Sequence, residues 1–364
     1  KKSVECFCEK YNAIIFYDQT SNYNGTYGIP CGVFNITGFP NLNIDCMIHI
    51  GNISASWPVT PGQVWRVNPD GEIRDTFKKL TKVFEMEEEE FFKYYCKKTE
   101  KDNNSLYKKW NLEYEKILTK IKTENDKIPF SSFWIAQYMY DKLPSNAVIH
   151  FGILNSLRCW NCFRVDKSIR GYANTGGFGI DGGVSSLIGA SLNNKEKLYY
   201  GIFGDLAFFY DMNSLGNRHI GHNVRIMIVN NGLGGEFKNS LGNVQKAGLG
   251  DLANEYIAAY GHYGEKSIKL VKDYAQNLGF TYFSAHSKKE FIEKSKEFLF
   301  PNMTNKSIIF EVFVDDHDDA DAISFVQSMG KKVEEKSKVI NKTKKIAKNI
   351  LRDTSANVIK KIKR

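Results

Sequence analysis

The stretch LYYGIFGDLAFFYDMNSLGNRHIGHNVRIMIVNNGLGG, residues 198–235, decides the fold of this 364-residue chain. It holds two apolar runs that end in small or polar residues: Gly204 and Asp205 follow the first run, and Asn230 and Asn231 follow the second. A helix-length segment separates the two runs. This arrangement is typical of two parallel β-strands joined by a helical crossover.

The same alternation continues on both sides of this stretch. We predict strands at residues 148–153, 171–174, 198–204, 224–229, 280–284 and 308–314, with helix-length segments between them. Strands that alternate with helices indicate a doubly wound, mostly parallel sheet with helices on both faces. Because ligands of such sheets bind beyond the carboxyl ends of the strands, we expect the chemistry just after these runs.

The first third of the chain has a different pattern. Residues 1–80 alternate short apolar runs with turns, which predicts strands at residues 13–17, 46–50 and 64–67. Residues 76–128 are strongly charged, and we expect them to be helical. The sequence therefore predicts two α/β domains, at residues 1–100 and 129–330, joined by a charged helical connector at 101–128 and followed by a tail at 331–364.

Composition indicates a soluble protein. Hydrophobic residues make up 42% of the chain and charged residues 25%, and no apolar run approaches the roughly 20 residues that span a bilayer. No signal peptide leads the sequence, so we expect a cytoplasmic protein, and the missing initiator Met predicts a longer product. Cys159 and Cys162 lack a second pair at zinc-binding spacing, and we interpret them as reduced thiols on a helix.

Positive charge is concentrated in the tail. Residues 331–364 hold thirteen Lys or Arg and three Asp or Glu, whereas the whole chain has a net charge of +9. The remainder is nearly neutral, so we expect no nucleic acid partner. Val339, Ile346 and Ile350 recur at helical spacing among the lysines. A Lys-rich amphipathic helix can lie on anionic lipid, and a solvated tail is the competing interpretation.

The polar residues at the two strand ends predict a cation site. A carboxylate from Asp205 and an amide oxygen from Asn231 can meet in space, and Mg²⁺ prefers oxygen ligands together with phosphate oxygens. The glycine-rich turn at residues 231–235 allows a diphosphate to approach the backbone closely. The helix expected to start near Leu206 adds its positive end for the same anion.

The motif from Gly204 to Asn231 resembles that of thiamine diphosphate-dependent enzymes. The sequence around this motif, together with Gly179-Ile180-Asp181-Gly182 and Asn155-Ser156, resembles that of the menaquinone-pathway synthases that make 2-succinyl-5-enolpyruvyl-6-hydroxy-3-cyclohexene-1-carboxylate. Residues 47–51 and 65–75 resemble the central domain of that family. The resemblance covers roughly residues 10–330, so it implies a central domain followed by a diphosphate-binding domain.

The resemblance also implies a set of site residues. Asp205 and Asn231 would be Mg²⁺ ligands, with the backbone oxygen of Leu233 as the third. Ile180 is the candidate for the apolar wedge beneath the bent cofactor. The full set implied to bind the cofactor is Asn155, Ser156, Gly179, Ile180, Asp181, Gly204, Asp205, Leu206, Ala207, Asn231, Leu233 and Gly234.

Two positions depart from the family's pattern. The family has arginines where this chain has Trp160 and Thr175. Those arginines bind substrate carboxylates, and a bidentate arginine is hard to replace. The candidates to take their place are Arg158, Arg164 and Arg170. The sequence therefore predicts the family's cofactor more firmly than its menaquinone reaction.

Enzymes of this class also carry an N-terminal domain that binds the aminopyrimidine ring and supplies a catalytic glutamate. Glu5 and Glu9 lie too near the start of this sequence to be that residue, so no catalytic residue is assigned. The implied reaction is decarboxylation of a 2-oxo acid, followed by protonation or carboligation. The implied assembly is a homodimer or homotetramer, or a complex with a chain that carries the pyrimidine-binding domain.

Two alternatives stay open. Residues 177–182 form a literal GxGxxG, which can indicate a Rossmann-type dinucleotide-binding protein, although that interpretation leaves Asn230 and Asn231 without a role. The chain can also be a non-catalytic or regulatory subunit that keeps the fold.

Two further features favour structural interpretations. For His219 and His222 we favour a structural or solvated role over catalysis. The acidic residues at 315–321 are interpreted as the charged start of a helix and not as a metal cluster.

Overall fold

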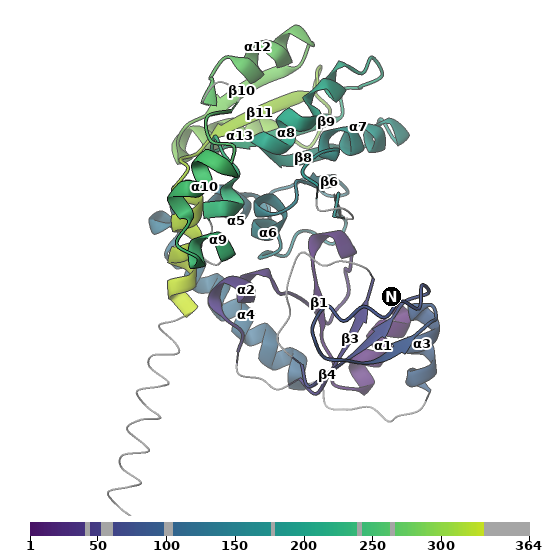
Figure 1. The fold of residues 1–364 in the computed structure, drawn as a ribbon. Coiled ribbons are helices and arrows are strands. Elements are labelled where there is room, and N and C mark those ends of the chain that lie inside the picture. Colours follow the sequence, from purple (N-terminus) through teal and green to yellow (C-terminus); the bar gives the residue numbers. More distant parts are fainter. Residues whose placement is uncertain are drawn as a thin grey trace, which may run out of the picture.

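The structure is a computed structural model that describes residues 1–40, 44–51, 61–97, 105–175, 179–238, 242–262 and 266–330. These residues form a larger α/β part and a smaller one (Figure 1). The predicted tail at 331–364 lies outside the described residues. Among the residues that are described, no helix combines the length and the apolar character needed to cross a membrane.

The larger part is built on a six-stranded sheet in which every pair of neighbours is parallel. The strand order is β10-β11-β9-β8-β6-β7. All six strands predicted after residue 128 are confirmed, each within two residues at either end. They are β6 (Val148–Phe151), β7 (Arg170–Ala173), β8 (Tyr199–Gly204), β9 (Val224–Asn230), β10 (Thr281–Ala285) and β11 (Ile308–Phe313).

Helices cover both faces of this sheet, as predicted (Figure 1). Alternate residues of β9 show why: Val224, Ile226 and Ile228 belong to one buried cluster, and Met227 and Val229 belong to another. The first cluster includes residues of α7 (Gly183–Asn193), α8 (Asp205–Asp211) and α12 (Leu270–Asn277). The second includes residues of α5 (Ser132–Met139), α6 (Asn155–Trp160) and α13 (Lys288–Phe298). Strands that are buried on both faces explain the continuous apolar runs in the sequence.

The smaller part contains a three-stranded parallel sheet of β3 (Cys46–Ile50), β4 (Gln63–Val67) and β5 (Leu80–Phe84). Strand β5 corrects the prediction that residues 76–128 are helical throughout, because helix begins only with α3 (Glu88–Cys96). The helix α1 (Lys2–Lys10) was not predicted either. Phe91 and Phe92 of α3 are buried with Val67 in a cluster of their own.

A two-stranded sheet and a short helix near the start of the chain pack against the larger part. Strands β1 (Ile15–Tyr17) and β2 (Gly28–Pro30) pair in parallel, and α2 (Gly32–Thr37) follows them. Val33 and Phe34 share a buried cluster with Trp110 and Tyr114 of α4 (Ser105–Thr123) and with residues of the six-stranded sheet. The charged connector is therefore helical where it is described, and one face of it is buried. The boundary at residue 100 stays a prediction.

Three short elements connect strands of the larger sheet. A 3₁₀ helix, η3 (Met212–Gly216), follows α8, and α9 (Asn243–Lys246) and α10 (Gly250–Tyr256) lie between β9 and α12. After β11 the chain is helical from residue 318 to residue 330. The acidic run at 315–321 thus leads into a helix, which confirms that prediction.

Candidate functional site at the carboxyl ends of the strands

The structure brings the two predicted cation ligands together. Strand β8 ends at Gly204, which pairs with Val229 of β9, so Asp205 and Asn231 leave neighbouring strands at the same edge. The backbone N–H of Gly232 donates a hydrogen bond of 2.9 Å to Oδ2 of Asp205. Both side chains are buried, with 4% of Asp205 and 6% of Asn231 exposed. A carboxylate and an amide thus share one sheltered position at the strand ends.

Burial gives the Asp205 carboxyl group an unusual proton affinity. Desolvation raises its pKa to about 7, and this effect outweighs the lowering by backbone hydrogen bonds from Leu206 and Gly232 and by the charge of Lys266. A buried carboxylate of this kind is stabilised in its ionised form by a nearby cation. Its oxygens and the amide oxygen of Asn231 are the donors that Mg²⁺ prefers, so the residues fit the expected ion.

The glycine turn after β9 closes around these residues. Gly232 has a positive φ of 75°, which few other residues adopt. A Cβ placed on Gly235 would lie 2.7 Å from Nδ2 of Asn231 and 2.8 Å from Nδ2 of Asn155. Asn155, at the start of α6 after β6, therefore meets the turn that follows β9. Position 235 must therefore lack a side chain, so that the segments after β6 and β9 can meet there.

This convergence occurs where the order of the sheet reverses. The chain passes from β6 outward to β7 at the sheet edge and returns to β8 on the other side of β6. Ligands of doubly wound sheets bind in the crevice at such a reversal. Asn155 follows β6 and Asp205 follows β8, so both residues stand on it.

Known proteins resemble this chain in sequence. The 2-succinyl-5-enolpyruvyl-6-hydroxy-3-cyclohexene-1-carboxylate synthase of Flavobacterium psychrophilum is 34% identical over 295 residues, which cover 77% of this chain and 50% of the relative. The synthase of the same name from Bacteroides fragilis is 29% identical over 261 residues, which cover 71% and 44%. This chain is a relative of the thiamine diphosphate-dependent synthases. It spans about half the length of the curated relatives it matches.

A solved structure has a similar fold. The Rhodococcus jostii RHA1 thiamine diphosphate-dependent 4-hydroxybenzoylformate decarboxylase has a TM-score of 0.57 at 14% identity, with 86% of this chain and 58% of that chain covered. This likeness shows the thiamine diphosphate-binding fold and no more. No family model matches the chain.

The topology does not support the dinucleotide-binding alternative. Gly177 and Phe178 of the GxGxxG lie outside the described residues, but Gly182 follows β7, which is an edge strand. In a Rossmann sheet the glycine loop follows a central strand at the reversal point. The relatives and the fold both belong to thiamine diphosphate-dependent enzymes, so this alternative is set aside.

The other predicted cofactor residues lie in three places. Ser156 is buried in α6 beside Asn155. Gly179, Ile180 and Asp181 precede α7, where the carbonyl oxygen of Asp181 accepts a hydrogen bond of 3.0 Å from Nδ2 of Asn174. Ile180 packs, partly buried, on the cluster that holds residues of α7 and α8. Its role as a wedge stays a prediction. Gly204, Leu206, Ala207, Leu233 and Gly234 flank the two predicted cation ligands directly.

A buried carboxylate that the sequence did not single out joins the site. Asp319 is 7% exposed, and its Oδ2 accepts a hydrogen bond of 3.2 Å from Nδ2 of Asn231. Burial raises the pKa of Asp319, against the lowering effect of its hydrogen bonds from Ser132 and Asn231. Strand order could have revealed it, because β11 lies beside β9 and its following residue, Val314, donates its N–H to the Asn230 carbonyl.

The arginine substitutes differ in where they lie. Trp160, which stands where the family has an arginine, is a buried, uncharged core residue and cannot bind a carboxylate. Arg158 bonds to Oδ1 of Asn155 at 3.4 Å and forms an ion pair with Glu236, beside the glycine turn. Arg164 pairs instead with Glu115, and Arg170 donates to the Asn22 carbonyl. Of the three, Arg158 contacts a predicted cofactor residue.

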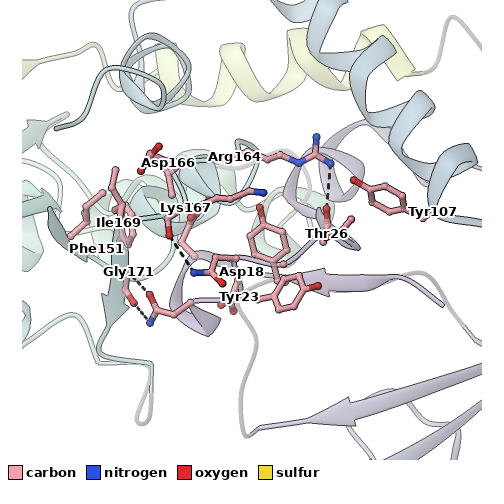
Figure 2. Close-up of a pocket in the computed structure, with 18 residues that line it drawn as sticks. Asp18, Tyr23, Thr26, Tyr107, Phe151, Arg164, Asp166, Lys167, Ile169 and Gly171 are labelled. Carbon is pink, nitrogen blue, oxygen red and sulfur yellow. Dashed lines mark hydrogen bonds between the residues drawn. The ribbon is translucent and has the colours of Figure 1, made fainter. Parts of the chain in front are cut away.

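A separate cavity of about 270 Å³ lies between the first third of the chain and the sheet (Figure 2). Asp18, Tyr23 and Arg164 are among its lining residues. Both hydrogen bonds between the Asn22 amide and the backbone of Gly171 lie beside it, on the free edge of β7. None of the predicted cofactor residues lines this cavity, so it is distinct from the site at the strand ends.

The remaining candidates have ordinary surroundings. His219 and His222 are exposed in the loop before β9. Cys159 lies in α6 and Cys162 just beyond it, and both are buried, free thiols, as predicted. Among the residues that the structure describes, no cluster of three or more His, Cys, Asp or Glu side chains is arranged to hold a metal. A cation at the strand ends would therefore depend on Asn231 and backbone oxygens beside Asp205.

Proposed function

We propose that this chain is the diphosphate-binding part of a thiamine diphosphate- and Mg²⁺-dependent enzyme that decarboxylates a 2-oxo acid, with carboligation to an acceptor as a further step. The observation that carries the proposal is that Asp205 and Asn231, both buried, follow neighbouring parallel strands at the same edge of the sheet. When bound, thiamine diphosphate supplies the electron sink that the loss of carbon dioxide from a 2-oxo acid requires.

The residues of this chain would hold the charged end of the cofactor. Asp205 and Asn231, with the carbonyl oxygen of Leu233, would hold the ion, which would supply the positive charge that binds the diphosphate. Asn155 and the turn around Gly235 would border the diphosphate. The burial that raises the pKa of Asp205 also keeps water from this end. Because burial raises the pKa of Asp205, its carboxylate would hold a cation in competition with a proton near neutral pH.

The substrate and the assembly belong to the same proposal. Arg158 contacts a predicted cofactor residue through its bond to Asn155. It would have to exchange its ion pair with Glu236 to receive a substrate carboxylate. The aminopyrimidine ring and its glutamate would come from a pyrimidine-binding domain, in a homodimer, a homotetramer or a partner chain. The small-molecule substrate is a 2-oxo acid.

Titration calorimetry with thiamine diphosphate and Mg²⁺ tests the proposal on the full chain. We expect saturable, Mg²⁺-dependent binding to the unaltered chain and a loss of at least about ten-fold in affinity for Asp205→Asn, because the ion loses a charged ligand. Asp273→Asn, an exposed change in α12, makes the same charge difference away from the site and should bind normally. Equal binding by the chain and Asp205→Asn, or no binding by either, would refute the proposal.

A further inference from the structure

Asp319 is fixed by the start of a helix on one side and holds Asn231 on the other. Its Oδ1 accepts a hydrogen bond of 2.6 Å from the backbone N–H of Ser132, the first residue of α5. Its Oδ2 accepts one of 3.1 Å from Oγ of Ser132 and one of 3.2 Å from Nδ2 of Asn231. The N–H groups of a first helical turn have no partner within the helix, so Asp319 satisfies one of them.

This contact determines which way the Asn231 amide faces. Asp319 is the acceptor in all three of these hydrogen bonds, and an asparagine amide has one accepting oxygen and one donating NH₂ group. Asn231 must therefore turn Nδ2 toward Asp319. Its Oδ1 then faces the glycine turn, where the N–H of Leu233 lies 3.3 Å away. A reversed amide would set two oxygens against each other in a buried position.

We propose that Asp319 is a positioning residue that keeps Oδ1 of Asn231, and not its NH₂ group, directed at the divalent cation. This inference rests on the proposed function, because Asn231 matters to the ion only if the ion binds there. The inference goes beyond the proposed function because it makes the affinity for the cation depend on Asp319, a residue that does not itself touch the cation. The swap of Asp and Asn between these two positions is the experiment that isolates this role.

In Asp319→Asn, the new amide oxygen must still accept the Ser132 N–H, which turns its NH₂ group toward Asn231. Asn231 then reverses to accept that bond, and it presents its own NH₂ group to the cation. We expect the affinity for Mn²⁺, used as a paramagnetic probe with thiamine diphosphate, to fall by about ten-fold to a hundred-fold. In the double variant Asp319→Asn with Asn231→Asp, the carboxylate introduced at the second position accepts from the new amide and offers its other oxygen to the ion, so binding should return.

Asp321→Asn is the matched control, because this exposed residue lies on the same helix and loses the same charge. It should bind Mn²⁺ as the unaltered chain does. If Asp319→Asn binds as tightly as the control, or if a folded double variant fails to recover binding, the inference is wrong. Circular dichroism and thermal unfolding identify folded variants. Should the single variant not fold, the double variant still decides, since it contains both substitutions.

A metal-free measurement separates this inference from the proposed function. In protein labelled with ¹⁵N at asparagine, the Asn231 NH₂ resonance is assigned by its disappearance in Asn231→Asp. We expect this NH₂ group to be protected from solvent exchange in the unaltered chain and to lose that protection in Asp319→Asn. If no ion binds to the unaltered chain but the protection changes as expected, the cation proposal fails while the orientation of the amide by Asp319 stands. Unchanged protection overturns the inference, whatever the ion does.

Discussion

Adding one methyl group at Gly235 should separate cofactor binding from folding. The Cβ of Gly235→Ala would lie 2.7 Å from Nδ2 of Asn231 and 2.8 Å from Nδ2 of Asn155. Optimal contacts between non-bonded heavy atoms begin near 3.5 Å, so each amide must move by about 0.7 Å. Neither amide is free to turn aside, because Asp319 bonds to one and Arg158 to the other.

The size of this displacement sets the expected loss. Mg²⁺ demands near-ideal octahedral geometry with ligands at about 2.0–2.1 Å, so a shift of about 0.7 Å at Asn231 is large. We expect the affinity for thiamine diphosphate with Mg²⁺ to fall by roughly ten-fold to a hundred-fold. The backbone of Gly235 is outside the positive-φ region, so alanine adds no backbone strain. The displacement of the two amides is then the expected cost to the metal-free fold, so its thermal midpoint should fall far less than cofactor affinity does.

Calorimetry of cofactor binding and thermal unfolding of the metal-free protein measure the two effects separately. Gly216→Ala is the matched control, because a Cβ there meets nothing within 4 Å and its φ is also not positive. That variant should bind and unfold as the unaltered chain does. Normal binding by Gly235→Ala with an unchanged midpoint would show that the cation does not lie beside these amides, and the reasoning would fail.

Two further predictions concern the sheet that carries the site. Burial lowers the pKa of His150 from 6.5 to about 4, so the unfolded chain takes up the additional proton as the pH falls from 6.5 to 4. Stability should decline in that window by up to roughly 3 kcal/mol more than in His150→Phe, as measured by urea unfolding at pH 7 and pH 4.5. Arg225 is fully buried and donates to the Tyr200 hydroxyl at 2.9 Å and to the carbonyls of Phe298, Phe300 and Asn302. Arg225→Met should lower the free energy of unfolding by roughly 3–5 kcal/mol, whereas Arg218→Met in the exposed loop should leave the urea midpoint unchanged.

The fold of the larger part could be predicted because its strands are buried on both faces. Each strand is then a short apolar run with a polar end, as residues 224–231 illustrate. Strand β5 escaped prediction because Lys79 and Lys82 give it the charge of a solvated helix, although Val83 and Phe84 form a strand beside β4. Pairing with the adjacent strand determines the structure of such a segment more than its own composition does.

That Asp205 and Asn231 follow adjacent parallel strands was predictable for a similar reason. Strands that are adjacent and parallel place their carboxyl ends at the same edge, so two polar ends must meet. The contact of Asp319 with Asn231 was not predictable, because no local sequence pattern indicates that β11 lies between β9 and β10. Only that order brings the residues after β11 to Asn231. The acidic run at 315–321 was correctly assigned to a helix start, and one of its members turns inward to the site.

Burial of the polar residues at the strand ends has a cost in folding free energy. Asp205, Asn231 and Asp319 are each less than a tenth exposed, and burial raises the pKa of both carboxyl groups. A carboxylate held this way costs free energy relative to water, and the two apolar clusters on the faces of the sheet must offset that cost. A cation that binds only the folded state would recover part of it, by an amount that grows with the ion concentration relative to its dissociation constant. The proposed cation would thus offset part of the cost of burying Asp205, which the apolar clusters alone must otherwise offset.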